Sequence, residues 1–416
     1  MEAQYMQVSG KNVKDANGNT VTLRGINYPI LDQGEIDFNT NSFQYYIDEF
    51  AKTGANTIRI PWYTNGQHWR DSVDFGAPGT LDGYIANGRL AALIDYCFLK
   101  NLYVVLDIHD ITCTNDWAKF NGQVMNFWKS PNVVNLINTH QSKLIINLAN
   151  EFGEDGTWGW GGTMAQFTTN YKNAVADLRA LNIKVPIMID APNCGQHSSP
   201  LVAASADILS GDSLANLIFS THTYWYGYAD TNAQIDAKMN EIIGSPQCFI
   251  LGEVAKRQDN DDCFNTVDIT ATYQRILTTA CTEKMGWLAW TYSLDCASQR
   301  EMTPDGNFAN LTVFGDDIVN NPTYGLKVPS CGEVLQTSEV KISGIKVFPN
   351  PNGGEFTIQT ESEIIGVELF DQSARKVSAI KEISKNKYRV NTNDGVYLLQ
   401  VKTKTGNFSE QLIINN

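Results

Sequence analysis

Two glutamates, Glu151 and Glu253, each end a short apolar segment, LIINLANE at 144–151 and CFILGE at 248–253. Two carboxyl groups held roughly 5–5.5 Å apart can cleave a glycosidic bond with retention of configuration, because one protonates the leaving oxygen while the other attacks the anomeric carbon. Burying a carboxylate is costly, so an ion pair at a strand end is the alternative for either glutamate alone. Together with their polar neighbours, they predict Glu151 as general acid/base and Glu253 as nucleophile.

Three further polar residues stand near the ends of similar segments. Asn150 precedes Glu151 and could hydrogen-bond the 2-hydroxyl of a sugar, an interaction that strengthens in the transition state. Arg59 could supply positive charge beside Glu253. Tyr224 could donate its hydroxyl to Glu253, or could stack on a sugar at the rim of the site.

Two histidines and a tryptophan complete the candidate site. His109 and His222 could orient the carboxylates and the sugar hydroxyls, although a histidine taken alone is more often structural. Trp290, in GWLAWTY at 286–292, could form an apolar floor beneath a pyranose, or could belong to the core.

The elements that must position these residues follow a repeating pattern. Near-continuous hydrophobicity suits parallel strands buried on both faces, and eight such segments alternating with helical spacing predict a closed (β/α)8 TIM barrel. An open doubly wound sheet would usually show a G-x-G-x-x-G turn, which is absent from the sequence. In a barrel, side chains at the carboxyl ends of the strands converge on one face. The predicted strands are 21–28, 57–61, 102–109, 144–151, 185–190, 217–224, 248–253 and 286–292.

The pattern changes after Tyr324. Residues 326–341 are predicted to be a linker between a catalytic domain at 1–325 and a C-terminal domain at 342–416. Short alternating segments such as EFTIQT and VYLLQVKT, separated by Gly, Asn and Asp, predict that the C-terminal domain is a small all-β sandwich.

Composition excludes several classes of partner. The net charge of -14 without a basic stripe argues against nucleic acid, and no apolar run reaches the roughly 18 residues of a membrane span. The opening MEAQYMQVSG has no basic stretch followed by an apolar one, so we expect an intact signal peptide to be absent, or trimmed and replaced by an initiator Met.

The chemistry needs no metal or cofactor, and the eight cysteines form no C-x-x-C pair that would suggest a zinc cluster. A disulfide between Cys248 and Cys281, which precede neighbouring predicted strands, and buried free thiols are both open alternatives. The acidic segment RQDNDDC at 257–263 lacks the ligand spacing of a regular calcium loop, so a solvated loop is predicted there.

Taken in order, these motifs resemble glycoside hydrolase family 5, the family of cellulases, β-mannanases and their relatives. The resemblance covers about residues 5–325 and implies a retaining double displacement, with all eight residues named above at the cleavage subsite. Phe152 stands where many members have Pro, which puts the shape of the following loop in doubt. The motifs are LRGINY, TIRIPW, LDIHD, LANE, THTY, LGE and LAWTY.

The substrate expected from this resemblance is a plant cell-wall polysaccharide. IMIDAPNCGQ at 187–196 and the pair His109–Asp110 are similar to the bacterial β-mannanase branch, so endo-β-1,4 hydrolysis of mannan or glucomannan is favoured over cellulose. Aromatic residues of the loops would line a long cleft and give endo action, unless they pack between barrel and helices. They are Trp62, Trp69, Trp117, Trp128, Trp158, Trp160, Trp225 and Tyr226. A non-catalytic glycan-binding barrel should have lost a glutamate or its partners, whereas a transglycosylase would keep them all.

The C-terminal domain resembles the type A sorting domain of the type IX secretion system, through IKVFPNP and GVYLLQV. This implies that the secretion machinery is a partner and that the enzyme, expected to be a monomer, is secreted or held on the outer cell surface. A carbohydrate-binding sandwich is the competing interpretation, but the segment has no tryptophan for a stacking platform.

Overall fold

The chain divides into two compact units, Met1–Val334 and Leu335–Asn416. The first unit continues beyond residue 325, because Leu326 is buried in its core and Cys331 is joined to Cys281. Residues 332–341 of the predicted linker lie outside the described part. The computed structural model describes residues 5–30, 42–63, 85–86, 88–159, 161–262, 265–329, 331, 345–360, 362–371, 376–377, 380–404 and 406–415.

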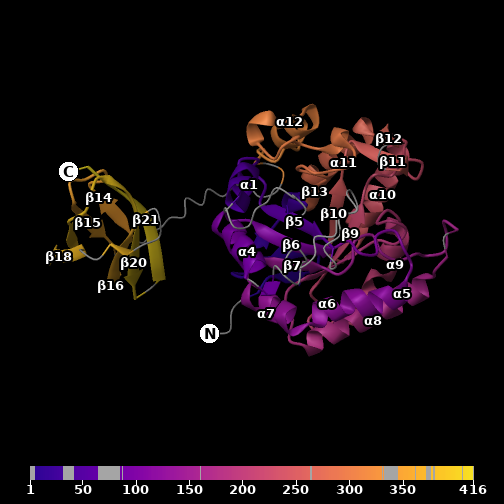
Figure 1. Ribbon diagram of the computed structural model, residues 1–416, viewed down its shortest axis with the longest axis horizontal. Coiled ribbons are helices and arrows are strands. Elements are labelled where there is room, and N and C mark those ends of the chain that lie inside the picture. Colours follow the sequence, from indigo (N-terminus) through magenta and orange to yellow (C-terminus); the bar gives the residue numbers. More distant parts are fainter. Residues whose placement is uncertain are drawn as a thin grey trace. The chain divides into compact units, whose positions relative to one another are not determined.

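The first unit is built on a closed barrel of eight parallel strands, which confirms the predicted (β/α)8 fold (Figure 1). Nearly every residue of these strands is buried, as their continuous hydrophobicity requires. The strands are β4 (Arg24–Asn27), β5 (Thr57–Trp62), β6 (Tyr103–Ile108), β7 (Leu144–Asn147), β8 (Ile187–Asp190), β9 (Leu217–His222), β10 (Phe249–Val254) and β13 (Trp287–Ala289).

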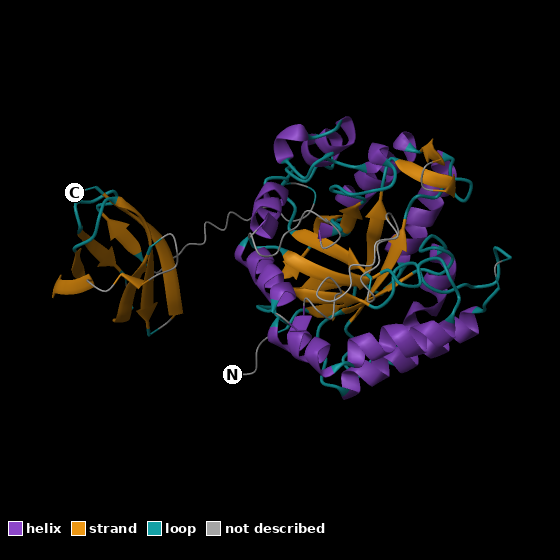
Figure 2. Ribbon diagram, viewed as in Figure 1, coloured by secondary structure: helices purple, strands orange, loops and turns teal. Residues whose placement is uncertain are grey.

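Helices surround the barrel (Figure 2). Among the described residues, no helix combines the length and the apolar content needed to cross a bilayer. The helices are α1 (Ser42–Ala51), α4 (Arg89–Leu99), α5 (Trp117–Lys119), η2 (Phe120–Val124), α6 (Met125–Lys129), α7 (Pro131–Thr139), α8 (Met164–Ala180), α9 (Ser198–Leu209), α10 (Asn232–Gly244), α11 (Thr270–Thr282), η3 (Ser298–Arg300), η4 (Phe308–Asn310) and α12 (Val313–Asn320).

Helix α8 shows how the sequence specifies this outer layer. Thr163 caps its start by accepting a hydrogen bond from the backbone N–H of Gln166, which satisfies a donor that the helix leaves unpaired. Phe167, Tyr171 and Leu178 are buried at helical spacing on one face, so that face packs in the core.

Apolar side chains fill the amino-terminal end of the barrel. Val105, Ile145 and Ile250 from the barrel strands form one buried cluster with Met6 and Val13 from the start of the chain. A small antiparallel sheet of β1 (Gln7–Ser9), β2 (Asn12–Lys14) and β3 (Thr20–Val21) belongs to this end. The polar side chains of the barrel therefore collect at the opposite, carboxyl end.

The acidic segment at 257–263 does not form the predicted loop. It contributes β11 (Arg257–Asp262), which pairs with β12 (Asn265–Asp268) in an antiparallel hairpin after β10. Asp259 accepts a hydrogen bond from Arg300 at 2.8 Å, so this carboxylate already has a cationic partner. The prediction failed because a polar hairpin lacks the apolar alternation by which strands are recognised.

Of the two open alternatives for Cys248, the disulfide with Cys281 is wrong and the buried free thiol is confirmed. Cys248 is a buried free thiol in the cluster at the amino-terminal end of the barrel, and Cys281 on α11 bonds to Cys331 instead. A second disulfide joins Cys113 to Cys194.

The second unit has two four-stranded sheets, which confirms the predicted all-β character. Its core contains Phe356, Leu369, Leu399 and Leu412, which alternate with more exposed residues along their strands. One sheet has the order β14 (Lys346–Phe348), β15 (Glu355–Gln359), β19 (Lys387–Val390) and β18 (Ile380–Ser384); the other has β17 (Lys376–Val377), β16 (Ile364–Phe370), β20 (Gly395–Thr403) and β21 (Gly406–Ile414).

Candidate active site

The two glutamates predicted to act together lie at the same end of the barrel. Glu253 is on β10, whereas Glu151 lies in the turn that follows β7, with a left-handed backbone (φ 49°). One carboxylate oxygen of each and an imidazole nitrogen of His222 all lie within 4.8 Å of one another. That separation fits the roughly 5–5.5 Å of a retaining pair and is too short for the roughly 6.5–9.5 Å of an inverting one.

His222, the last residue of β9, lies between the two carboxylates. Its Nδ1 is 2.8 Å from Oε1 of Glu151 and 3.5 Å from Oε2 of Glu253. Burial alone would lower the pKa of His222, but the negative charges of Glu253 and Asp190 raise it to about 10. His222 is therefore an imidazolium at neutral pH that donates to Glu151.

Burial raises the pKa of Glu151, and the charges of Glu253 and Asp190 act in the same direction. The hydrogen bond and the charge of His222 oppose the shift without cancelling it. A carboxyl group that keeps its proton nearer to neutral pH is suited to act as a general acid.

Arg59 on β5 is fully buried beneath the carboxylates. It lies 2.9 Å from both Asp107 and Glu253, and 3.6 Å from Asp190. Burial opposes its charge, but these three carboxylates raise the pKa of Arg59 further above its usual range. It also donates to the side-chain oxygen of Asn150 at 2.6 Å.

Tyr224 follows β9 and donates its hydroxyl to Oε2 of Glu253 at 2.6 Å. Burial and the neighbouring Glu253 charge hold the pKa of Tyr224 well above its usual value, so it stays a donor. With Arg59 on Oε1 at 2.9 Å, both oxygens of Glu253 accept a hydrogen bond. These contacts fix the orientation of the carboxylate.

His109 and Trp290 form another part of the site. Nε2 of His109 lies 2.6 Å from the carboxylate of Asp107, and its ring stacks against Trp290 with 5.9 Å between centroids. The indole N–H of Trp290 donates to Asp295 at 3.1 Å. Asn150 accepts from Arg59 and donates to Thr112, so all eight predicted side chains are linked by contacts at one end of the barrel.

Sequence reasoning missed three acidic residues that hold these groups. Asp107 and Asp190 are fully buried beside Arg59, and Asp190 accepts from the backbone N–H of Glu151 at 3.1 Å. Burial would raise the pKa of Asp190, but His222 and Arg59 lower it below its usual range. Both aspartates end or nearly end apolar strands, the same signal that identified Glu253. Asp295 lies in the loop after β13 and gave no such signal.

The loop aromatic residues divide between packing and exposure. Trp62, Trp128 and Trp225 are fully buried, so they pack in the core and do not line a cleft. Tyr226 is 43% exposed, and Trp158 is half-buried against the ring of His197. Trp69 and Trp160, which were also candidates for the cleft, lie outside the described residues.

The trio Glu151, His222 and Glu253 is also one of two clusters of described residues that could hold a metal ion. Nδ1 of His222 contacts Glu151, and its pKa of about 10 keeps a proton on the ring. A metal ion would have to displace that proton.

Comparison with known proteins gives two family matches. Residues 14–295 match the family described as cellulase (glycosyl hydrolase family 5), and residues 346–415 match a secretion system C-terminal sorting domain. The C-terminal match indicates a protein that is secreted or displayed on the cell surface.

Curated relatives cover much of the first unit. A mannan endo-1,4-beta-mannosidase of Salipaludibacillus agaradhaerens is 25% identical over 315 residues, which are 75% of this chain and 90% of the relative. One from Cellvibrio japonicus is also 25% identical, over 77% of this chain; the chain spans only 66% of that relative.

Solved structures share the fold at lower identity. A β-mannanase from Thermomonospora fusca superposes with a TM-score of 0.62 and 22% identity over 79% of this chain and 99% of that one. A β-glucanase from Saccharophagus degradans superposes with a TM-score of 0.59 and 17% identity, over 75% of this chain and 90% of that one.

Proposed function

The chain belongs to glycosyl hydrolase family 5, and from that premise we propose that it is a retaining endo-β-1,4-glycan hydrolase acting on mannan or glucomannan. The observation that carries the proposal is the pair Glu151 and Glu253, brought within 4.8 Å of each other at His222. Family membership makes the chain an O-glycosyl hydrolase, and the roles of individual residues are our assignment.

In the first step, a carboxylate oxygen of Glu253 attacks the anomeric carbon while Glu151 gives its proton to the departing glycosidic oxygen. The bond between sugar and leaving group breaks, and a glycosyl ester with Glu253 forms. Arg59 and Tyr224 hold the attacking carboxylate in place, one on each oxygen. Asn150, held by Arg59, presents its amide toward the 2-hydroxyl of the sugar.

In the second step, Glu151 acts as a base and takes a proton from water, whose oxygen attacks the anomeric carbon. The ester bond breaks, Glu253 leaves as a carboxylate, and the product keeps the original configuration. A sugar hydroxyl in place of water would give transglycosylation with the same residues.

Mannan is proposed as the substrate because the curated relatives include mannan endo-1,4-beta-mannosidases. Cellulose is the alternative, since a β-glucanase described in complex with cellotetraose shares the fold. Side-by-side hydrolysis of galactomannan, glucomannan, soluble cellulose derivative, xyloglucan and xylan decides between them. Release of oligosaccharides of mixed length from the two mannans is expected, and shortening from the chain ends alone would contradict endo action.

Two variants test the assigned roles. Glu253→Gln should abolish turnover while oligosaccharide binding persists, and near-normal activity would remove Glu253 as the nucleophile. Glu151→Ala should slow the cleavage of phenyl glycosides far more than that of 2,4-dinitrophenyl glycosides, which need little protonation. An equal loss of activity on both glycosides would show that Glu151 is not the general acid.

For the second unit, we propose that residues 342–416 engage the type IX secretion machinery and that the chain after Cys331 joins them to a monomeric catalytic domain. Deletion of 342–416 should leave an active enzyme inside the cell, as measured by activity in the medium and the cell extract. Normal export of the truncated chain would contradict the proposal. Retention of the isolated segment on insoluble glycan would instead support the competing carbohydrate-binding role.

A further inference from the structure

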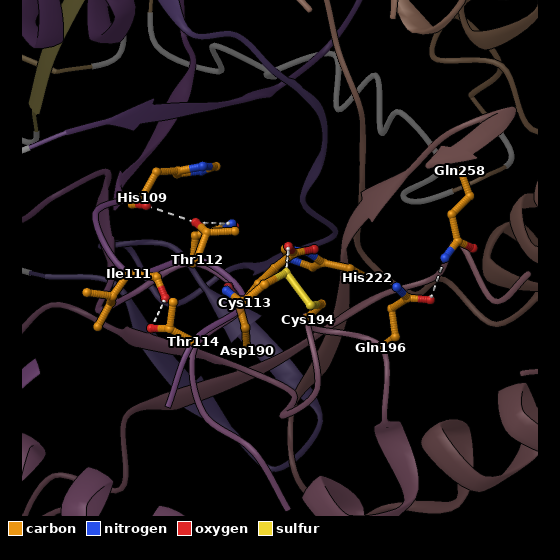
Figure 3. Close-up of a disulfide and its surroundings, with 12 residues drawn as sticks. His109, Ile111, Thr112, Cys113, Thr114, Asp190, Cys194, Gln196, His222 and Gln258 are labelled. Carbon is orange, nitrogen blue, oxygen red and sulfur yellow. Dashed lines mark hydrogen bonds and ion pairs between the residues drawn. A yellow bond between two sulfur atoms is a disulfide. The ribbon is translucent and has the colours of Figure 1, made fainter. Parts of the chain in front are cut away.

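A disulfide crosses the turn that carries Glu151. Cys113, in the loop after β6, is bonded to Cys194, in the loop after β8 (Figure 3). Glu151 follows β7, the strand between them. Cys113 is exposed and Cys194 is half-buried, so the disulfide is accessible from solvent. The proposed hydrolysis uses neither sulfur.

Cys113 contacts Glu151 through both backbone and side chain. Its backbone N–H donates to the carbonyl oxygen of Glu151 at 3.1 Å, and its sulfur lies 3.3 Å from Oε2 of the Glu151 carboxyl. A sulfur in a disulfide carries no hydrogen, so it cannot donate to that oxygen. The other oxygen, Oε1, accepts from His222.

Cys194 supports the histidine that contacts Glu151. The next residue, Gly195, accepts a hydrogen bond from the backbone N–H of His222 at 2.7 Å. A Cβ on Gly195 would lie 2.7 Å from Cγ of His222, so this turn packs directly on the ring. The two ends of one disulfide therefore hold the glutamate and its hydrogen-bond partner.

We propose that the Cys113–Cys194 disulfide is a positioning group for the acid/base Glu151. It fixes the turn so that Oε2 carries the transferable proton and faces the leaving oxygen, with sulfur beside it where water would otherwise hydrate it. The proposal rests on the proposed function, because it needs Glu151 to be the proton donor.

The effect should appear in the ionisation of Glu151. The charged groups that face this carboxyl are His222 from β9, Glu253 from β10 and Asp190 from the end of β8. All three remain when the disulfide is lost, but water gains access to Oε2. Since burial is the main reason for the raised pKa of Glu151, that pKa should fall, and activity should be lost at a lower pH on the alkaline side.

The test compares two double variants of the full chain. Cys113→Ala/Cys194→Ala removes this disulfide, and the matched control Cys281→Ala/Cys331→Ala removes a disulfide away from Glu151. General acid catalysis contributes roughly 10²–10⁴-fold, so partial loss of positioning should slow phenyl β-glycosides by about ten- to a hundredfold. Cleavage of the 2,4-dinitrophenyl glycoside should stay within about twofold, and the control should resemble the wild type on both substrates.

If Cys113→Ala/Cys194→Ala does not fold, chemical reduction of the folded enzyme provides the same test. Dithiothreitol supplies two electrons and two protons, closes to its own cyclic disulfide, and leaves Cys113 and Cys194 as thiols. Cys296 is disulfide-bonded as well, so the protein to be treated carries Cys281→Ala, Cys331→Ala and Cys296→Ala. Compared with its untreated form, it should show the same selective loss on phenyl glycosides and the same shift of its alkaline limb.

An unchanged ratio between the two substrates, or an equal loss on both, overturns the inference. Glu151→Ala separates this failure from failure of the proposed function. If Glu151→Ala loses more activity on phenyl than on 2,4-dinitrophenyl glycosides and loss of the disulfide does not, only the proposed role of the disulfide is wrong. If Glu151→Ala itself does not discriminate, the assigned acid is wrong.

Discussion

Replacing Arg59 with Met should destabilise the barrel strongly at neutral pH. Methionine is unbranched and adaptable enough to fill the space, but it removes the positive charge that faces three buried carboxylates. Two of these, Asp107 and Glu253, lie 2.9 Å from the guanidinium, and Asp190 lies 3.6 Å from it. Of these three carboxylates, Asp190 and Glu253 would keep His222 as a cationic neighbour, at 3.6 Å and 3.5 Å.

Removal of one partner from a buried ion pair costs roughly 3–5 kcal/mol, because the other charge is left without compensation. Arg59 has three such partners, so we expect a loss near the upper end of that range. Its hydrogen bonds to Asn27, Asn147 and Asn150 disappear as well.

The loss should shrink as the pH falls. In the wild type, the lowered pKa of Asp190 contributes stability above the pKa of the unfolded chain, and this contribution is lost on acidification. In Arg59→Met, the buried carboxyl groups can take up protons at low pH, which relieves their mutual repulsion. Proton uptake by the variant brings the two proteins closer together between pH 7.5 and pH 5, and the loss of the Asp190 contribution adds to this only below the pKa of an unfolded aspartate, about 3.9.

Urea unfolding followed by tryptophan fluorescence measures this difference in the barrel alone, because all nine tryptophans precede residue 335. The control is Arg275→Met, which breaks a solvent-screened pair with Asp236 and should leave the free energy of unfolding nearly unchanged. A loss below about 1 kcal/mol for Arg59→Met, or the same loss at both pH values, would refute the reasoning.

Three further predictions follow from the site. Tyr224→Phe removes a hydrogen bond to a charged oxygen, worth roughly 1.5–3 kcal/mol, so kcat should fall by about 10- to 150-fold; an unchanged kcat would contradict its role in holding Glu253. Gly195→Ala places a Cβ against His222 at a backbone φ of 72°, so the free energy of unfolding should drop by about 1–3 kcal/mol in urea titrations, and a neutral effect would argue against this packing. The pKa of His222, raised to about 10, gives stability that is complete below the unfolded value and lost as the pH rises, so the free energy of unfolding should decline from pH 7 to 10; a flat profile would exclude this shift.

Much of the barrel could be predicted because each parallel strand carries its own signal. A run such as LIINLANE is buried on both faces and ends in polar residues, so one pattern marked both the strand and the candidate site. The same run shows what the pattern lacks, since β7 ends at Asn147 and Glu151 lies in a turn with a left-handed backbone. Where a strand stops depends on hydrogen bonds to its neighbours, which a hydrophobic run does not reveal.

Pairings between distant loops could not be predicted in the same way. The partners of Cys113 and Cys281 depend on how close the loops approach in the folded barrel, and the sequence carries no signal for that proximity. Asp190 illustrates a weaker failure: IMID ends in a carboxylate as CFILGE does, but its role depends on Arg59 and His222, which come from other strands.

The bond between Cys281 and Cys331 has a mechanical consequence for an enzyme whose C-terminal segment is handled by export machinery. Residues 282–330, with β13, Trp290 and α12, lie inside a covalently closed loop. Tension applied to the chain beyond Cys331 passes through the sulfur atoms into α11 and bypasses that loop. The strand that positions Trp290 is thereby shielded from force when the polypeptide is pulled from its C-terminal end.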